Sequence, residues 1–333
     1  MDRRAFISTV ALGPLAVPRV ALAQPARNIY RIGILGVRVP ASELTGPQPR
    51  DPHLAALLRE LRALGYVYGE HFVTEVRSGE GKLERFPGLA AELVRLKVDL
   101  IVTSGPSLPA VKQATSTIPV VMIGAADPVA QGVAHSLGRP GGNFTGSSIQ
   151  LVETTAKRLE LLKELAPGAA PVAVLWDPRG GGPPLSWRAA ESAARERGWK
   201  LLSLEIKDTG EIDSAFKAAT AARAGAVLVL PTAVLDKQAH RIAELAAKSR
   251  LAAVYGLRLY VEAGGLMSYS PDVMEMYRRA AVFIDKILKG ARPGDLPFEQ
   301  PTKFELVINL KAARTIGLAI PQSILARADE VIR

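Results

Sequence analysis

The feature that most constrains the fold is a regular alternation of short apolar runs with longer amphipathic stretches. The first run, at 31–36 (RIGILG), is followed after a loop by Asp51-Pro52 and by five leucines: Leu54, Leu57, Leu58, Leu61 and Leu64. Leucines spaced three and four residues apart lie on one helix face, and Asp-Pro is typical of an N-cap and a first helical residue. The segment therefore predicts a strand followed by a helix that stops at Gly65.

The same alternation continues along the chain in two series. The first series predicts strands at 72–76, 99–105 and 119–124 and helices at 86–96, 108–115 and 128–137. A bridging helix at 154–165 leads to the second series, with strands at 171–177, 200–206, 225–231 and 251–256 and helices at 186–197, 212–222 and 236–249. Continuous apolar strands separated by helices are typical of parallel sheets covered on both faces. We therefore predict an α/β fold with two doubly wound parallel-sheet lobes.

The N-terminus has the pattern of an export signal. Arg3 and Arg4 precede an apolar run of about 13 residues, which is shorter than the roughly 20 needed to span a bilayer. Small residues at 21–23 (ALA) form a cleavage site, so the mature chain is predicted to begin at Gln24. The paired arginines indicate a twin-arginine signal at 1–23, and a frayed amphipathic terminus is the alternative. We expect a periplasmic protein.

Composition excludes several classes of function. The chain carries a net charge of +10, but its basic residues are scattered and not gathered with aromatics, so nucleic acid is not expected as a partner. There is no cysteine, and the four histidines stand far apart, so neither a metal site nor a cofactor is predicted. The usual nucleophile-elbow, Walker and dinucleotide-binding motifs are missing. These observations argue against an enzyme.

Four loops at the carboxyl ends of predicted strands are candidates for a binding cleft. They are the segments 103–107, 124–128, 177–182 and 231–233. Ligands of open parallel sheets bind at these strand ends, and helix N-termini there favour an anion. Asp127 and Asp177, each followed by proline, are equally consistent with ordinary helix caps.

Several stretches of the sequence together resemble one known family. They include LRALGYVYGEHF, VDLIVTSGPSLPAVKQATSTIPVVMIGAADPVAQGVAHSLGRPGGNFTG, KRLELLKELAPG, GGLMSYSPD and YRRAAVFIDKILKGARPGDLPFEQPTKFELVINLKAARTIGLAIP. In this order they resemble the substrate-binding proteins of ABC transporters, whose relatives include binders of tryptophan and other aromatic amino acids. The resemblance spans residues 30–333.

The resemblance implies a type I periplasmic-binding fold. Two lobes joined by a hinge would close over a small-molecule ligand and deliver it, as a monomer, to an ABC permease in the inner membrane. We expect the first lobe to comprise 30–145 and 271–333, and the second 146–270. The segment 264–270 is the expected hinge crossing, with a helix at 273–288 returning to the first lobe.

By position, the resemblance also implies the ligand contacts. The predicted contacts are Arg38, Ser104, Gly105, Asp127, Asp177, Thr232, Tyr255, Gly256 and Tyr269, with Ser107 added on chemical grounds. For a zwitterionic amino acid, Ser104, Ser107 and Arg38 could hold the carboxylate and Asp127 the ammonium group. Tyr255, Tyr269 or Trp187 could stack on an aromatic side chain, although core packing is an equal alternative.

The sequence departs from the family pattern in three loops, at 39–50, at 177–187 (DPRGGGPPLSW) and at 231–238 (PTAVLDKQ). These departures leave the ligand open. Two other functions remain as alternatives. One is a sensor that presents its closed form to a membrane receptor, and a permease gene adjacent to this gene would argue against it. The other is an exported α/β enzyme, which would be supported if changing Asp127 or Asp177 abolished turnover.

Overall fold

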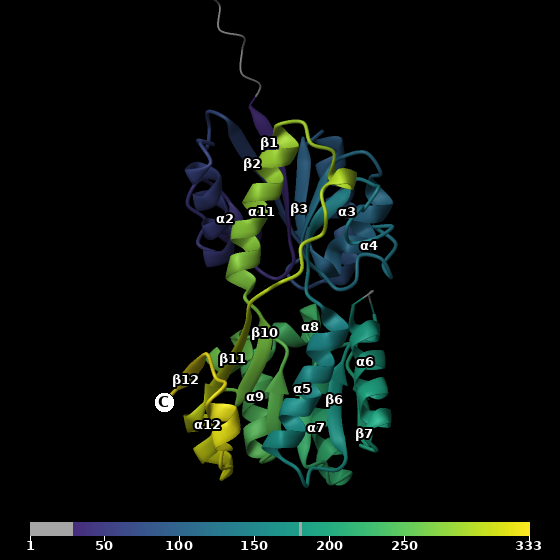
Figure 1. Cartoon of the computed structure of the whole chain (residues 1–333), viewed down its shortest axis with the longest axis vertical. Coiled ribbons are helices and arrows are strands. Elements are labelled where there is room, and N and C mark those ends of the chain that lie inside the picture. The colour runs from purple at the N-terminus through teal and green to yellow at the C-terminus, as the bar shows by residue number, and fades with distance from the viewer. Residues whose placement is uncertain (1–28, 180–181) are drawn as a thin grey trace, which may run out of the picture.

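The chain folds into two α/β lobes, one above the other in Figure 1. The computed structural model describes residues 29–179 and 182–333, so the predicted signal at 1–23 lies outside the described residues. Within those residues no helix is both long and apolar enough to cross a bilayer. The two lobes confirm the fold class expected from the alternating pattern.

The first lobe contains a five-stranded parallel sheet. Its strand order is β2 (Phe72–Ser78), β1 (Tyr30–Gly36), β3 (Leu100–Ser104), β4 (Val120–Ala125) and β5 (Phe144–Ser148). Its helices are α1 (Ala41–Leu44), α2 (Pro52–Ala63), α3 (Phe86–Arg95), α4 (Leu108–Ala114) and α11 (Val273–Leu288), with 3-10 turns η1 (Leu83–Arg85), η2 (Gly105–Ser107) and η4 (Pro293–Asp295). Helices α2 and α11 pack on one face of the sheet and α3 and α4 on the other. The sheet is therefore covered on both sides, which its apolar strands require.

The second lobe contains a seven-stranded sheet that is parallel except for one pair. The order is β12 (Glu330–Ile332), β11 (Phe304–Asn309), β10 (Met267–Pro271), β9 (Ala252–Tyr255), β8 (Ala226–Val229), β6 (Val172–Trp176) and β7 (Leu201–Glu205), with β10 and β11 antiparallel. Its helices are α5 (Leu151–Leu165), α6 (Pro183–Glu196), α7 (Ile212–Ala221), α8 (Ala233–Asp236), α9 (Ala239–Lys248), α10 (Leu259–Glu262), α12 (Leu310–Ile316) and α13 (Gln322–Leu325), with the turn η3 (Thr209–Glu211).

Asp51 shows how local sequence sets an element. Its carboxylate accepts a hydrogen bond from the Leu54 amide at 2.7 Å, and Pro52 occupies the first helical position of α2. Four leucines of the predicted stripe are buried against α11 and the sheet, whereas the fifth, Leu64, follows the last residue of the helix and is exposed. The predicted helix and its start are thus confirmed, and α11 also has the predicted bounds of 273–288.

The lobe boundaries need two corrections. The tail at 304–332, expected in the first lobe, belongs to the second, because β11 pairs with β10 and β12 pairs with β11. Conversely, residues 146–148 remain in the first lobe, where β5 pairs with β4. Because the tail follows a helix of the first lobe in the chain, the sequence predicts it in that lobe. Strand pairing, which is a long-range interaction, places it in the second lobe.

The chain crosses between the lobes three times, after β5, after β10 and before β11 (Figure 1). The amide of Asp272 donates to the carbonyl of Lys303 at 3.2 Å, so two of the crossings lie side by side. The segment 264–270, expected as the hinge, instead enters β10 inside the second lobe, and the crossing follows at Asp272.

One predicted helix is absent from the first lobe. Residues 128–137 form a series of turns, in which the amides of Val133 and Ala134 both donate to the Pro128 carbonyl. Gly132 adopts a φ of +66°, a left-handed conformation that ends a helical turn. Although its apolar residues have helical spacing, this segment therefore forms turns and not an α-helix.

Candidate functional site

A cavity of about 250 Å³ lies between the lobes, at the carboxyl ends of strands from both sheets. The first lobe contributes apolar side chains that include Ile34, Val37, Leu44, Leu54, Val102, Ile123, Val273 and Met276. The second lobe contributes Leu257 and residues of the loops that follow β6 and β8. Branched aliphatic groups dominate this lining, and its volume suits a compact small molecule.

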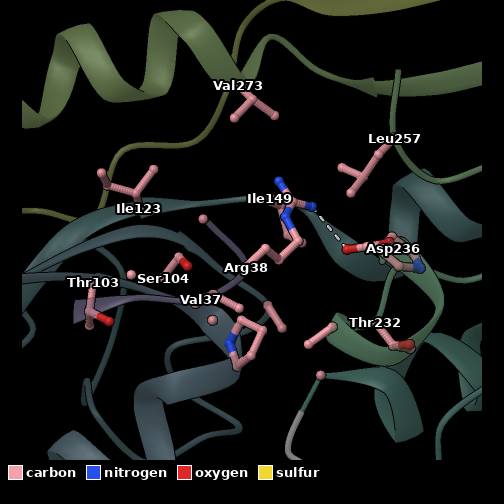
Figure 2. A pocket seen from close by; sticks show the side chains of 18 of the residues that line it. Val37, Arg38, Thr103, Ser104, Ile123, Ile149, Thr232, Asp236, Leu257 and Val273 are labelled. Atoms are coloured by element: carbon pink, nitrogen blue, oxygen red, sulfur yellow. Dashed lines mark hydrogen bonds and ion pairs between the residues drawn. The ribbon is translucent and has the colours of Figure 1, made fainter. Parts of the chain in front are cut away.

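Arg38 and Asp236 face each other across this pocket (Figure 2). Arg38 lies in the loop after β1, and Asp236 ends the short helix α8 of the second lobe. Nη1 of Arg38 lies 3.0 Å from Oδ2 of Asp236. Tyr260 donates its hydroxyl hydrogen to the other carboxylate oxygen at 3.0 Å. A charged pair that joins the two lobes thus lies in a largely apolar cavity.

Burial controls the electrostatics of this pair. Desolvation raises the pKa of Asp236, and the opposing attraction of Arg38 only partly offsets that effect. For Arg38, burial alone would lower the pKa, but the Asp236 carboxylate outweighs it and raises the pKa above the ordinary value. Asp236 therefore depends on Arg38 for its charged form, whereas the guanidinium stays charged.

Asp51, His53 and Tyr277 add further polar groups to the pocket wall. The His53 ring lies 5.3 Å from that of Tyr277, and its Nδ1 is 3.7 Å from the Asp51 carboxylate. Burial raises the pKa of Tyr277 to about 12, so its hydroxyl stays protonated at neutral pH. The lining holds two arginines, Arg38 and Arg179, and three aspartates, Asp51, Asp177 and Asp236. The pocket therefore does not favour an anion.

Five of the ten predicted contact residues line this pocket: Arg38, Ser104, Gly105, Asp177 and Thr232. Two of these are already engaged locally. Both carboxylate oxygens of Asp177 accept from the Arg179 guanidinium, at 2.8 and 2.9 Å. The Thr232 hydroxyl accepts from the Leu235 amide at 3.1 Å and caps α8. Arg38 and Ser104 remain the predicted polar side chains with capacity for a ligand.

Ser107 and Asp127 do not line the pocket, contrary to expectation. Ser107 is fully buried, and its hydroxyl contacts the Thr103 hydroxyl and donates to the Ser104 carbonyl at 2.8 Å. One carboxylate oxygen of Asp127 accepts from the amides of Val129 and Ala130 at 3.0 and 2.9 Å. Both side chains are therefore used to fix the turns that shape the pocket.

Tyr255, Gly256 and Tyr269 also lie outside the pocket lining. The Tyr255 ring is fully buried and stacks on Tyr260, with centroids 4.8 Å apart. The Tyr269 ring stacks on Phe304 within the second lobe. The carbonyls of Gly256 and Tyr269 accept hydrogen bonds from the buried Arg158 guanidinium. The core-packing alternative thus holds for both tyrosines, and Trp187 stacks on Trp176 in the same way.

Sequence reasoning missed Asp236, Tyr277, His53 and Gln131, all of which line the pocket. Asp236 lies one turn beyond Thr232, where the sequence predicts only the start of a helix at 236–249. An acidic residue one turn after a strand-end threonine was the available signal. Tyr277 and Val273 come from α11, whose place beside β4 and α2 is a tertiary feature.

Comparison with known proteins identifies the family. Residues 49–332 match the family described as ABC transporter substrate binding protein, and the chain belongs to this family. It is 25% identical over 279 residues to a tyrosine-binding protein of Clostridioides difficile (strain R20291), a match that covers 83% of this chain and 80% of that protein.

Two solved structures share the architecture. One is an ABC domain from Streptococcus pneumonia in complex with L-Trp (TM-score 0.81, 25% identity, 91% of this chain and 100% of that chain). The other is a conserved domain protein from Vibrio cholerae O1 biovar El Tor (TM-score 0.81, 24% identity, 91% and 99%). The fold is that of type I periplasmic binding proteins, as the sequence predicted.

Asp127 provides a direct test of the site as described. We expect Asp127→Ala to lower the free energy of unfolding by about 1 kcal/mol, because two amides lose their cap. The dissociation constant for the ligand of the pocket should change less than twofold, because the side chain does not line the pocket. Calorimetric titration and thermal melting measure the two quantities separately. Asp127→Asn, whose side-chain oxygen can still accept hydrogen bonds from the two amides, is the control. A tenfold loss of affinity in Asp127→Ala would show that Asp127 contacts the ligand.

Proposed function

We propose that this chain is the extracytoplasmic substrate-binding component of an ABC importer and that it captures an amino-acid-like molecule between its lobes. The observation that carries the proposal is the interlobe pocket, in which an aliphatic lining surrounds the Arg38–Asp236 pair. Such a pocket suits a molecule with an apolar body and a head group that bears both charges. The relatives named above, a tyrosine-binding protein and an L-Trp complex, support the same class of ligand.

The chemistry of the head group follows from the two charged residues. The Arg38 guanidinium, whose Nη1 contacts Asp236, can instead receive a ligand carboxylate through a pair of its N–H donors. The Asp236 carboxylate is the natural partner for an ammonium group. Since the pocket lining is not net positive, a zwitterion suits it better than an anion.

Binding would be coupled to closure. The pocket is lined from both lobes, and the lobes are connected by three chain crossings. A ligand that contacts both lobes binds the closed form more tightly than the open form. This difference in binding free energy shifts the open–closed equilibrium toward the closed form. We propose that the closed form is what the permease recognises, that the protein acts as a monomer, and that residues 1–23 direct its export.

A ligand screen tests this function. The mature chain from Gln24 to Arg333 is unfolded, washed free of bound ligand and refolded, and its melting midpoint is measured with each L-amino acid, with glucose and with isocaproate at 1 mM. A ligand at roughly 1,000 times its dissociation constant stabilises by about 4 kcal/mol, or roughly 8 °C for a chain of this size. We expect such a shift with at least one amino acid. A shift with glucose alone, or with no amino acid, would contradict the proposal.

A further inference from the structure

The Arg38–Asp236 contact joins the two lobes directly across the cleft, between residues 198 positions apart in the chain (Figure 2). The other ion pairs between described residues lie within one lobe or connect the chain crossings, as Lys303 and Asp272 do. The lobes are thus connected electrostatically at the place where a ligand head group would sit.

Asp236 is held in position for this contact by its own lobe. Its side chain is only 7% exposed, and Oδ1 accepts from the Tyr260 hydroxyl at 3.0 Å. The Tyr260 ring is fully buried and stacks nearly parallel on Tyr255, at an interplanar angle of 8°. One carboxylate oxygen is therefore fixed by the second lobe, and the other is presented to Arg38 of the first. A carboxylate so buried is unfavourable without a cation beside it.

A close approach of backbone and side chain lies next to the ion pair. Gly81 of the first lobe adopts a φ of +76°, and a Cβ built there would lie 2.5 Å from Cε of Lys237 in the second lobe. The Gly81 amide donates to the Val37 carbonyl at 2.7 Å, which ties this glycine to the loop that carries Arg38. Arg38 and Gly81 on one side therefore meet Asp236 and Lys237 on the other, with the flexible end of the Lys237 side chain lying against Gly81.

We infer that Arg38 and Asp236 form a latch, which is an ion pair that holds the lobes together in the ligand-free protein. A ligand must replace this ion pair when it binds. The inference rests on the proposed function for the identity of that ligand. A zwitterion can replace both members of the ion pair, because its carboxylate binds Arg38 and its ammonium group binds Asp236. A carboxylic acid of the same shape would satisfy Arg38 but leave the buried Asp236 unpaired. The latch therefore selects amino acids over their deaminated analogues.

The ligand-free latch can be tested by a distance measurement between spin labels. The chain has no cysteine, so labels at Lys82→Cys and Lys207→Cys attach only in the cleft-side loops of the first and second lobes. We expect a short-distance population in the ligand-free protein that is lost in Asp236→Asn and in Arg38→Gln. Asp213→Asn breaks the Asp213–Arg241 pair within the second lobe and should leave the distances unchanged. An unchanged distribution in Asp236→Asn, with melting temperatures like that of the parent, would overturn the latch.

Selectivity is tested with matched ligand pairs. Binding of L-leucine is compared with that of isocaproate, and L-tryptophan with indolepropionate, by calorimetric titration of the parent protein and of Asp236→Asn. We expect the parent to prefer the amino acid of at least one pair by about 100-fold or more, and Asp236→Asn to reduce that preference at least tenfold, because each 1.4 kcal/mol is a factor of ten. A preference that survives in Asp236→Asn overturns the selective role. If no amino acid binds the parent, the proposed function fails, while the label distances still decide the latch.

Discussion

Replacing Arg38 with glutamine is expected to weaken amino-acid binding by about 30-fold. Truncating one member of a hydrogen-bonded charge pair costs about 2 to 5 kcal/mol in an interface, and the lower value applies here because the Arg38 side chain is 35% exposed. The loss arises because the ligand carboxylate no longer meets a cation in the pocket. Calorimetric titration with the amino acid that gives the largest thermal shift measures the effect.

The control for Arg38 is an arginine of the same protein in an ion pair away from the pocket. Arg241 pairs with Asp213 and Glu244 on the surface of the second lobe, so Arg241→Gln removes the same charge without touching the pocket. We expect its affinity for the ligand to stay within twofold of the parent value. Equal losses in Arg38→Gln and Arg241→Gln would mean that only net charge is sensed, and an unchanged affinity in Arg38→Gln would remove Arg38 from the site.

Replacing Gly146 with alanine is expected to destabilise the protein by about 3 kcal/mol or more. Gly146 lies in the buried strand β5 with a φ of +131°, and a Cβ there would lie 2.1 Å from the Met122 carbonyl oxygen of β4. A non-glycine residue in such a conformation and the overpacking of the neighbouring strand each cost about 1 to 3 kcal/mol. The Gly146 carbonyl also accepts from the Glu299 amide at 2.8 Å, next to the third chain crossing.

Thermal melting measures the effect at Gly146, where a fall of roughly 6 °C or more is expected for a chain of this size. Gly168→Ala is the matched control, because no atom lies within 4 Å of a Cβ built at Gly168 and its φ is not positive. We expect Gly168→Ala to change the midpoint little. A melting midpoint of Gly146→Ala equal to that of the parent would show that the β4–β5 pair shifts to admit the methyl group.

Local pattern was a good guide where an element buries one face against a neighbour in the same lobe. The leucines of α2 and the N-cap Asp51 predicted a helix that the structure confirms, and the apolar runs of β1, β3 and β6 predicted parallel strands. The expected helix at 128–137 was wrong, because Gly132 takes a left-handed turn that apolar spacing does not reveal. Position within the family pattern also overestimated the site, since Tyr255 is buried against Tyr260 and the half-buried Tyr269 stacks on Phe304.

The family resemblance implied the place of Arg38 at the cleft, and the sequence pattern by itself determined the two-lobed α/β class and the strand ends that meet there. These features depend on hydrophobic periodicity and on chain order, which are local. Tertiary structure alone decided that the tail at 304–332 completes the second sheet and that Asp236 meets Arg38 across the cleft. Both depend on contacts between segments far apart in the chain, whose energies come from the packing of the whole fold and leave no periodic pattern in the sequence.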